Sequence, residues 1–184
     1  MELIGPYLVA CVLLVAAGAS KAVRPGDTAR AVADTVPLPL AVLAPAVRVG
    51  AGVEALVGLS GLAYPSTVTA GLVAVSYLAF AGFVTVVLVR GGPLASCGCF
   101  GRPDTPATRL HVVADLVLAV SAVTVAATVT AQGLGSLLAA QPWHGVPLAL
   151  ASLLGAWLAV LALGRLAEVG AARRLLGITR GSTA

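Results

Sequence analysis

The sequence predicts an all-α polytopic membrane protein, a bundle of transmembrane helices. Its 184 residues are 59% hydrophobic and 10% charged, with a mean hydropathy of +1.04, whereas soluble domains are about 45–50% apolar and about 25% charged. The apolar residues form long runs, and about 20 such residues cross a bilayer as one helix. The chain can hold four or five spans with short connections. The lipid bilayer is its expected partner, and the net charge of +4 is no sign of nucleic-acid binding.

The first span is expected from Leu3 to about Ala19. Because Glu2 stands where a secretory signal would carry positive charge, we interpret this segment as an uncleaved helix. Residues 21–39 are polar and rich in proline, and they predict a loop with a short interfacial helix over residues 27–34.

The second and third spans lie in one apolar run. No charged residue occurs from Ala55 to Val89, and a single helix of that length would measure about 52 Å against a hydrocarbon core of about 30 Å. The turn-forming residues 61–66, GLAYPS, divide the run. The second span is therefore expected at about 41–62 and the third at about 66–89.

The fourth span is expected at about 109–130. Residues 132–147 contain glycine and proline and predict an interfacial connection. The fifth span then runs from Pro147 to about Leu166, and a basic tail closes the chain.

Basic residues predict the orientation, because lysine and arginine near span ends are retained on the cytoplasmic side. Ten of the eleven fall on one side of the predicted topology, and Arg48 lies inside the second span near that side. The distribution predicts a plasma-membrane protein with its N-terminus outside and its C-terminus inside. The ten are Lys21, Arg24, Arg30, Arg90, Arg102, Arg109, Arg165, Arg173, Arg174 and Arg180.

The loop after the third span carries the most distinctive motif, Cys97-Gly98-Cys99-Phe100-Gly101. Two thiols at this spacing can close a strained disulfide, exchange with another protein's disulfide, or bind a soft metal ion. Gly98 allows the bend that a disulfide requires. Arg90 and Arg102 make the loop electropositive, which favours the reactive thiolate. The third cysteine, Cys11, lies mid-span and is interpreted as an apolar packing residue.

Ionisable residues within the spans form a second candidate set, because each is costly near the bilayer centre and tends to face the bundle interior. One interpretation is structural, with ion pairs that join the helices. The other is functional, and it applies most to the histidine and aspartate that share a helix face just after the cysteine loop. There a histidine held by a carboxylate could move protons or supply a third metal ligand. The set is Lys21, Arg48, Glu54, His111 and Asp115.

Five features follow one another along the chain: Gly18-x-x-Lys21, Arg24-Pro25, a glutamate in a glycine-rich second span, Arg90-Gly91 and the Cys-Gly-Cys-Phe-Gly motif. Their order resembles the methylamine utilisation protein MauE family, which is related to DoxX-like redox-associated membrane proteins. The resemblance implies a four-helix DoxX-like core over residues 1–130, followed in this chain by a connection, a fifth span and a tail over residues 131–184. Ala114 departs from the family pattern, which usually has arginine before the polar residue of the fourth helix.

The resemblance also implies a function in the maturation of a disulfide-rich exported protein such as methylamine dehydrogenase, beside a thioredoxin-like partner. Cys97 and Cys99 would carry the redox chemistry, with Lys21 and Glu54 as the intramembrane polar residues. Whether this chain is itself a thiol–disulfide oxidoreductase stays open, because no nucleotide, flavin or haem motif occurs. Docking of a quinone also stays open.

Two rival functions follow from the same residues. One is binding or transport of copper or zinc by Cys97, Cys99 and His111, and the other is a structural subunit of a membrane redox complex. A cytoplasmic thiol loop also conflicts with disulfide formation, which belongs to oxidising compartments. A relay of reductant from the cytosol, access to the loop from the other face, or a reversed topology would each resolve the conflict.

Overall fold

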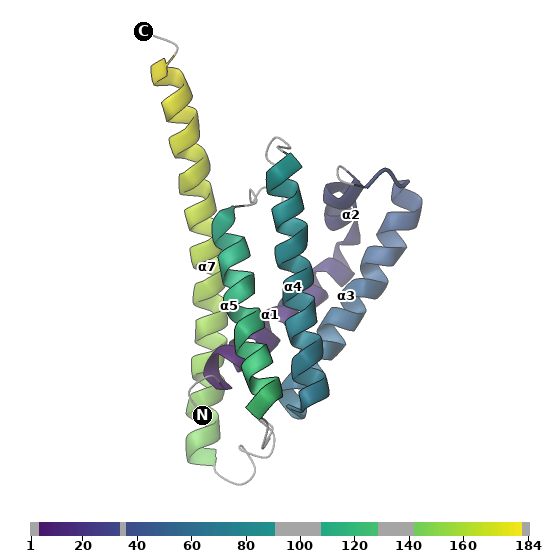
Figure 1. Ribbon diagram of the computed structural model, residues 1–184, viewed down its shortest axis with the longest axis vertical. Helices are drawn as coiled ribbons and strands as arrows, with labels where there is room; N and C mark the ends of the chain where they lie inside the picture. Colours follow the sequence, from purple (N-terminus) through teal and green to yellow (C-terminus); the bar gives the residue numbers. More distant parts are fainter. Residues whose placement is uncertain (1–3, 34–35, 91–107, 129–141, 182–184) are drawn as a thin grey trace.

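The computed structural model describes residues 4–33, 36–90, 108–128 and 142–181, and all of these are helical or short connections. Five of the six described helices are long and apolar enough to cross a membrane (Figure 1). The sixth, α2 (Pro25–Ala33), is the short helix expected after the first span. The predicted all-α polytopic bundle is therefore confirmed.

The spans lie close to their predicted positions. They are α1 (Ile4–Val23), α3 (Leu40–Ala63), α4 (Thr67–Arg90) and α5 (Arg109–Thr128), with α7 (Pro142–Gly181) crossing through its segment Gly145–Leu166. The crossing segment of α7 lies within two residues of the predicted fifth span, but the helix itself starts at Pro142, inside the stretch predicted as a connection. Proline at the first helical position suits its fixed φ and missing N–H, and the internal Pro147 removes only one backbone hydrogen bond from a 40-residue helix.

The turn between α3 and α4 is stabilised by a reciprocal cap at the site where the sequence predicts a break. The Ser66 N–H donates to Thr69 Oγ1 at 2.8 Å, and the Thr69 N–H donates to Ser66 Oγ at 3.1 Å. Each side chain thus satisfies a backbone donor that the first turn of α4 leaves unpaired. Pro65 precedes this cap and cannot continue α3.

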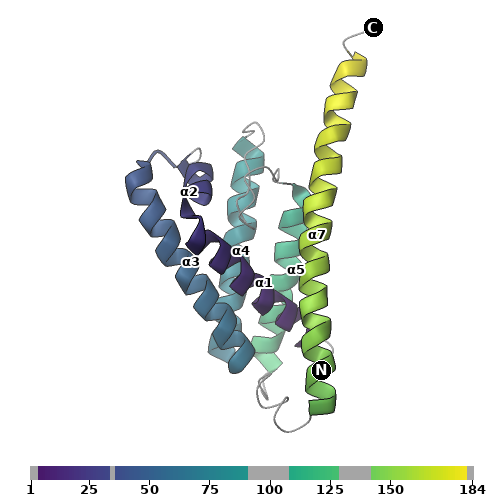
Figure 2. The same cartoon turned by 180° about the vertical axis from the view of Figure 1, so that it is seen from behind.

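The helices form two close pairs with α7 alongside. The most extensive contacts join α1 to α3 and α4 to α5, while α7 packs mainly on α1 and α2 packs on α3. The helix α1 runs obliquely across α4 and α5, behind them in Figure 1 and in front of them in Figure 2. It therefore contacts helices of both pairs and is the centre of the bundle.

The core is built mainly from α1, α4 and α5. Its largest fully buried side chains include Tyr7, Leu8 and Leu14 of α1 and Val73 of α4. The hydroxyl of Tyr77 on α4 donates to the Ala10 carbonyl of α1 at 2.7 Å. This buried bond fixes α4 against the N-terminal half of α1.

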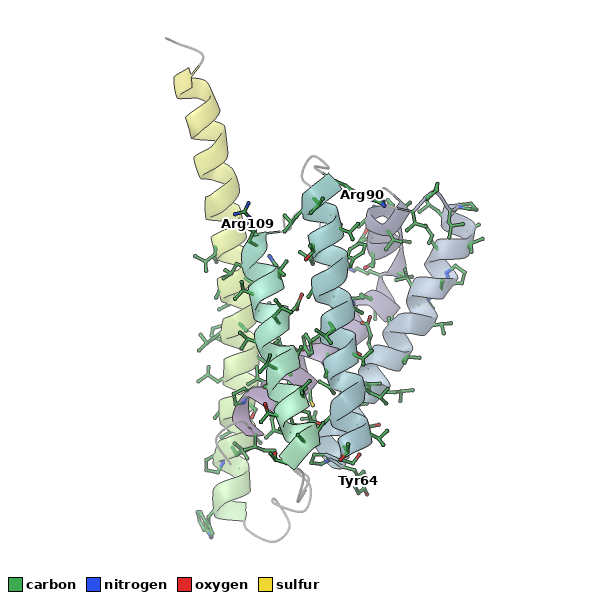
Figure 3. The ribbon with its side chains drawn as sticks, viewed as in Figure 1. Tyr64, Arg90 and Arg109 are labelled. Atoms are coloured by element: carbon green, nitrogen blue, oxygen red, sulfur yellow. The ribbon has the colours of Figure 1, made fainter. Side chains whose placement is uncertain are left out.

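The two ends of the bundle differ in charge, as the sequence predicts. Figure 3 places Arg90 at the end of α4 and Arg109 at the start of α5 on the same end of the bundle, opposite Tyr64. The C-terminal part of α7 extends beyond the bundle at the arginine end (Figures 1 and 2). The direction in which this end faces stays a prediction.

Candidate functional site

Cys97 and Cys99 lie outside the described residues. The two helices that flank their loop are described, and the ends that face the loop carry Arg90 and Arg109 on one end of the bundle (Figure 3). The candidate site is therefore the set of polar side chains that α1, α3, α4 and α5 bury beneath that end.

An ion pair between α1 and α3 is the first component of the site. Lys21 Nζ lies 2.7 Å from Glu54 Oε2, and the side chains are 8% and 21% exposed. Both residues belong to the predicted intramembrane set, and the structure brings them together from positions 33 residues apart. Because an ammonium group is costly to bury alone, the carboxylate is what allows Lys21 to lie inside the bundle.

Glycine allows the close approach of α1 and α3 on which this pair depends. A Cβ at Gly18 would lie 2.6 Å from the Ala51 carbonyl oxygen, and one at Gly58 would lie 2.7 Å from the Cys11 carbonyl oxygen. Such contacts are too short for any other residue. The face of α3 that carries Glu54, Gly58 and Gly61 therefore packs directly against α1.

An aromatic ring from a third helix completes the surroundings of the ammonium group. Lys21 Nζ lies 4.3 Å from the centroid of the Phe80 ring on α4. The negative face of the ring attracts the cation, and the interaction strengthens when water is excluded. Phe80 also meets Tyr77 edge to face, with ring centroids 5.8 Å apart.

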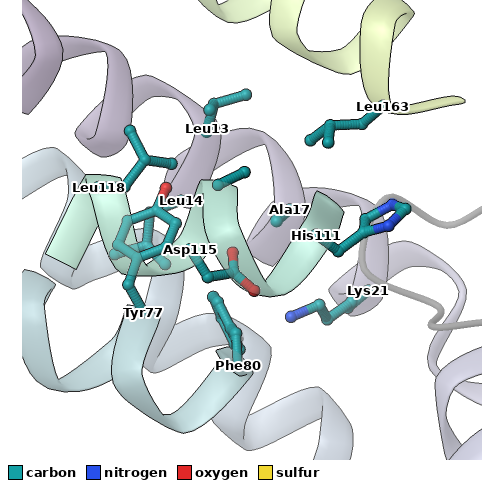
Figure 4. Close-up of a pocket in the computed structure, with 11 residues that line it drawn as sticks. Leu13, Leu14, Ala17, Lys21, Tyr77, Phe80, His111, Asp115, Leu118 and Leu163 are labelled. Carbon is teal, nitrogen blue, oxygen red and sulfur yellow. The ribbon is translucent and has the colours of Figure 1, made fainter. Parts of the chain in front are cut away.

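A small cavity of about 30 Å³ lies between α1, α4, α5 and α7. Its wall is mainly apolar and includes Leu163 of α7, but Lys21, Tyr77, His111 and Asp115 also line it. Figure 4 shows the Asp115 carboxylate and the Lys21 amine directed toward each other beside Phe80. The predicted pairing of His111 and Asp115 on one face of the fourth span thus places both at a shared cavity.

His111 connects this cavity with the start of α5. The ring is buried, and its Nδ1 lies 2.8 Å from Thr108 Oγ1, which is half-buried immediately before the helix. The hydroxyl fixes the orientation of the imidazole, and His111 is one of the residues that line the cavity. Within the described chain, His111 is therefore the buried titratable group closest in sequence to the cysteine loop.

Arg48 and Cys11 lie apart from this cavity. The side chain of Arg48 is exposed on α3, so the expectation that intramembrane charges face the interior was wrong for this residue. A long arginine side chain can reach the polar edge of the bilayer from such a position. Cys11 is fully buried in the core, where Gly61 packs against its sulfur, in agreement with a packing role.

Comparison with known families identifies the chain. The family described as methylamine utilisation protein MauE matches residues 2–130. The chain belongs to the MauE family. The MauE match includes the first four spans, the Cys-Gly-Cys motif and all five predicted intramembrane polar residues, while α7 follows it. Comparison with curated proteins and with solved structures gives no significant match.

Three side chains of this MauE-family site were absent from the sequence-based candidates. Phe80 and Tyr77 lie in α4, which is apolar on all sides. Its sequence therefore does not show which helix face contacts α1, and no local signal identifies these two residues. Thr108 could have been found, because a hydroxyl three residues before His111 at a helix start is a frequent side-chain partner. In the described part of the chain, no three histidine, cysteine or acidic side chains cluster as metal ligands would.

Proposed function

We propose that this MauE-family membrane protein is a thiol–disulfide redox or maturation factor that uses Cys97 and Cys99. The observation that carries the proposal is the Cys-Gly-Cys motif inside the region matched to the MauE family. A glycine between two cysteines permits a strained and therefore easily reduced disulfide. Such a bond is suited to exchange and poorly suited to a permanent structural role.

The reaction is a thiol–disulfide exchange with a dithiol of a client protein. A client thiolate attacks one sulfur of the Cys97–Cys99 disulfide, and the other cysteine leaves as a thiolate. The second client thiolate attacks the mixed disulfide and releases the first cysteine. The client loses two electrons and two protons, and Cys97 and Cys99 gain them. The client class that the family resemblance implies is an exported disulfide-rich protein such as methylamine dehydrogenase.

The reduced pair would then be reoxidised by exchange with the disulfide of a thioredoxin-like protein, which takes up the two electrons and two protons. A reduced thioredoxin-like protein would drive the same exchange in the opposite direction. In this proposal His111 serves the thiols as a proton acceptor and donor, supported by its buried position in the first turn of the helix that follows the loop. Lys21 and Glu54 support the site by joining α1 to α3 beneath it.

The basic residues at the arginine end of the bundle favour a cytoplasmic thiol loop. In that orientation the same exchange runs in reverse as a relay of reductant from the cytosol, whereas disulfide formation in an exported client requires access to the loop from the other face or a reversed topology.

The test is to trap the mixed disulfide in cells. Cys97→Ser and Cys99→Ser single variants are expected to lose client maturation, and one of them is expected to accumulate a covalent complex that reductant dissolves. Cys11→Ser is the matched control, because its thiol is buried in the core. Full client maturation in a Cys97→Ser/Cys99→Ser double variant would contradict the proposal and favour a structural subunit.

The metal-binding alternative is tested on protein purified under reducing conditions. Stoichiometric copper or zinc that is lost in the Cys97→Ser/Cys99→Ser variant would favour that function. The orientation is tested by labelling intact cells with permeant and impermeant maleimides, before and after reduction. Labelling by the impermeant reagent would place the thiols outside and contradict the predicted topology.

A further inference from the structure

We propose that Arg48 of α3 binds the phosphate of an anionic phospholipid in the leaflet at the arginine end of the bundle. Three observations carry this inference: Arg48 lies inside a span, its side chain is exposed, and no carboxylate of the described chain pairs with it. The inference uses neither the cavity nor the cysteines, so it does not rest on the proposed thiol chemistry.

The position of Arg48 is well inside the membrane-crossing segment. The span α3 begins at Leu40 and ends at Ala63, and the helix rises about 12 Å from Leu40 to Arg48. An arginine at such a depth is costly in hydrocarbon, and it is tolerated where it pairs with another polar group or reaches the polar edge of the bilayer.

The side chain of Arg48 lies on the lipid-facing side of α3. Few residues of this span are buried inside the bundle, and Ala51 marks the face that packs against α1. Arg48 is exposed, as are the apolar side chains of Val49, Val53 and Leu56. The charge of Arg48 therefore stands among apolar side chains that lipid tails cover.

No described carboxylate contacts Arg48. Glu54 on the same helix binds Lys21 at 2.7 Å, and Asp27 binds an arginine of its own helix, α2, at 3.2 Å. The third carboxylate among the described side chains, Asp115, lines a cavity to which α3 contributes no residue. The anion that pairs with Arg48 is therefore expected from outside the described chain.

The direction of the side chain leads to the phospholipid headgroups. The Cα–Cβ bonds of a helix tilt toward its N-terminus. The helix α3 starts at the arginine end, because Tyr64, which follows its last residue, lies at the opposite end in Figure 3. The long stem of Arg48 thus brings the guanidinium toward the nearer bilayer surface. There its planar donors fit a phosphate with two parallel hydrogen bonds.

The charge of this end favours an anionic lipid over a zwitterionic one. Arg24 and Arg30 are exposed at the two ends of α2, which packs on α3. Arg90 and Arg109 are exposed on the same end of the bundle (Figure 3). Exposed basic residues near a membrane surface attract lipids with a net negative charge.

A second copy of the chain fits this face less well than a lipid does. Two copies related by a twofold axis through the face would bring their Arg48 side chains together, and like charges repel strongly in an apolar medium. An anionic phospholipid supplies the opposite charge. Its acyl chains also cover the exposed Val49, Val53 and Leu56.

The test is native mass spectrometry of the full-length protein, titrated with dioleoylphosphatidylglycerol or dioleoylphosphatidylcholine. The wild-type chain is expected to bind phosphatidylglycerol more tightly, and Arg48→Gln to weaken that binding about tenfold. Because Arg48 is exposed, the substitution should leave the fold intact. Arg24→Gln is the matched control, since it removes an exposed arginine between α1 and α2 and should weaken binding far less.

Three results would overturn the proposal. The first is equal binding of the two lipids by the wild-type chain, and the second is an equal loss in Arg48→Gln and Arg24→Gln. The third is an unchanged lipid titration in Arg48→Gln together with release of a copurified membrane protein, which would assign Arg48 to a carboxylate of that protein. Arg48→Lys keeps the charge without the planar fork, so its affinity should fall between those of the wild type and Arg48→Gln.

Discussion

The ion pair between Lys21 and Glu54 should be the strongest polar link between α1 and α3. At the observed 2.7 Å, two unit charges attract by about 6 kcal/mol for an effective dielectric constant of about 20. Removing both charges from water costs several kcal/mol for each ion, so the net contribution of the pair is much smaller. Removing one partner leaves the other charge buried, and this is expected to cost about 3–5 kcal/mol.

The assay is a double-mutant cycle of Glu54→Gln, Lys21→Met and the combined variant, measured by reversible unfolding in mixed micelles. Glu54→Gln should be the more damaging single change, because it strands Lys21, which is 8% exposed, whereas Glu54 is 21% exposed. The combined variant should lose far less stability than the two single losses added together.

The pair of Arg30 and Asp27 on α2 is the control. Its atoms lie 3.2 Å apart, but the arginine side chain is 67% exposed, so a coupling of about 0.5 kcal/mol is expected. A coupling for Lys21 and Glu54 of about 1 kcal/mol or less would equal that of an exposed pair. It would refute the argument that burial makes the two charges interdependent.

Two further predictions concern helix packing and use the same unfolding assay. Gly58→Ala should destabilise the bundle by about 1–3 kcal/mol, because its Cβ would lie 2.7 Å from an α1 carbonyl oxygen, whereas Gly50→Ala meets open space and should not destabilise it. Equal effects of the two would disprove the close approach. Tyr77→Phe removes the 2.7 Å bond to an α1 carbonyl and should cost about 1–2 kcal/mol. The change Tyr64→Phe, at a residue 79% exposed, should be neutral, and a neutral Tyr77→Phe would show that the buried bond contributes nothing.

The span boundaries could be predicted because their signals are local. An apolar run of fixed length, the Tyr64-Pro65-Ser66 break and the arginines at span ends can each be read without knowing any neighbour. The structure places α3 and α4 within one or two residues of the predicted ranges. The fifth crossing segment, Gly145–Leu166, also lies within two residues of its predicted range, although α7 itself begins at Pro142, inside the stretch predicted as a connection.

The composition of the candidate site could be predicted only in part. Lys21, Glu54, His111 and Asp115 stand out because charge and imidazole are rare in a span. Arg48 stands out for the same reason, yet its side chain is exposed and does not line the cavity. Rarity indicates that a residue needs a polar partner or a polar edge, but it does not tell which of the two it has.

The sequence by itself therefore determined the membrane class, the number and order of the spans, the MauE family and the position of the thiol pair. Only the tertiary structure decided that Lys21 pairs with Glu54 beside Phe80, and that His111 and Asp115 line a cavity together with Lys21. The physical reason is that lipid is as apolar as the bundle interior. The spans α3, α4 and α5 are apolar on nearly all sides, so their sequence does not mark the face that meets a neighbouring helix.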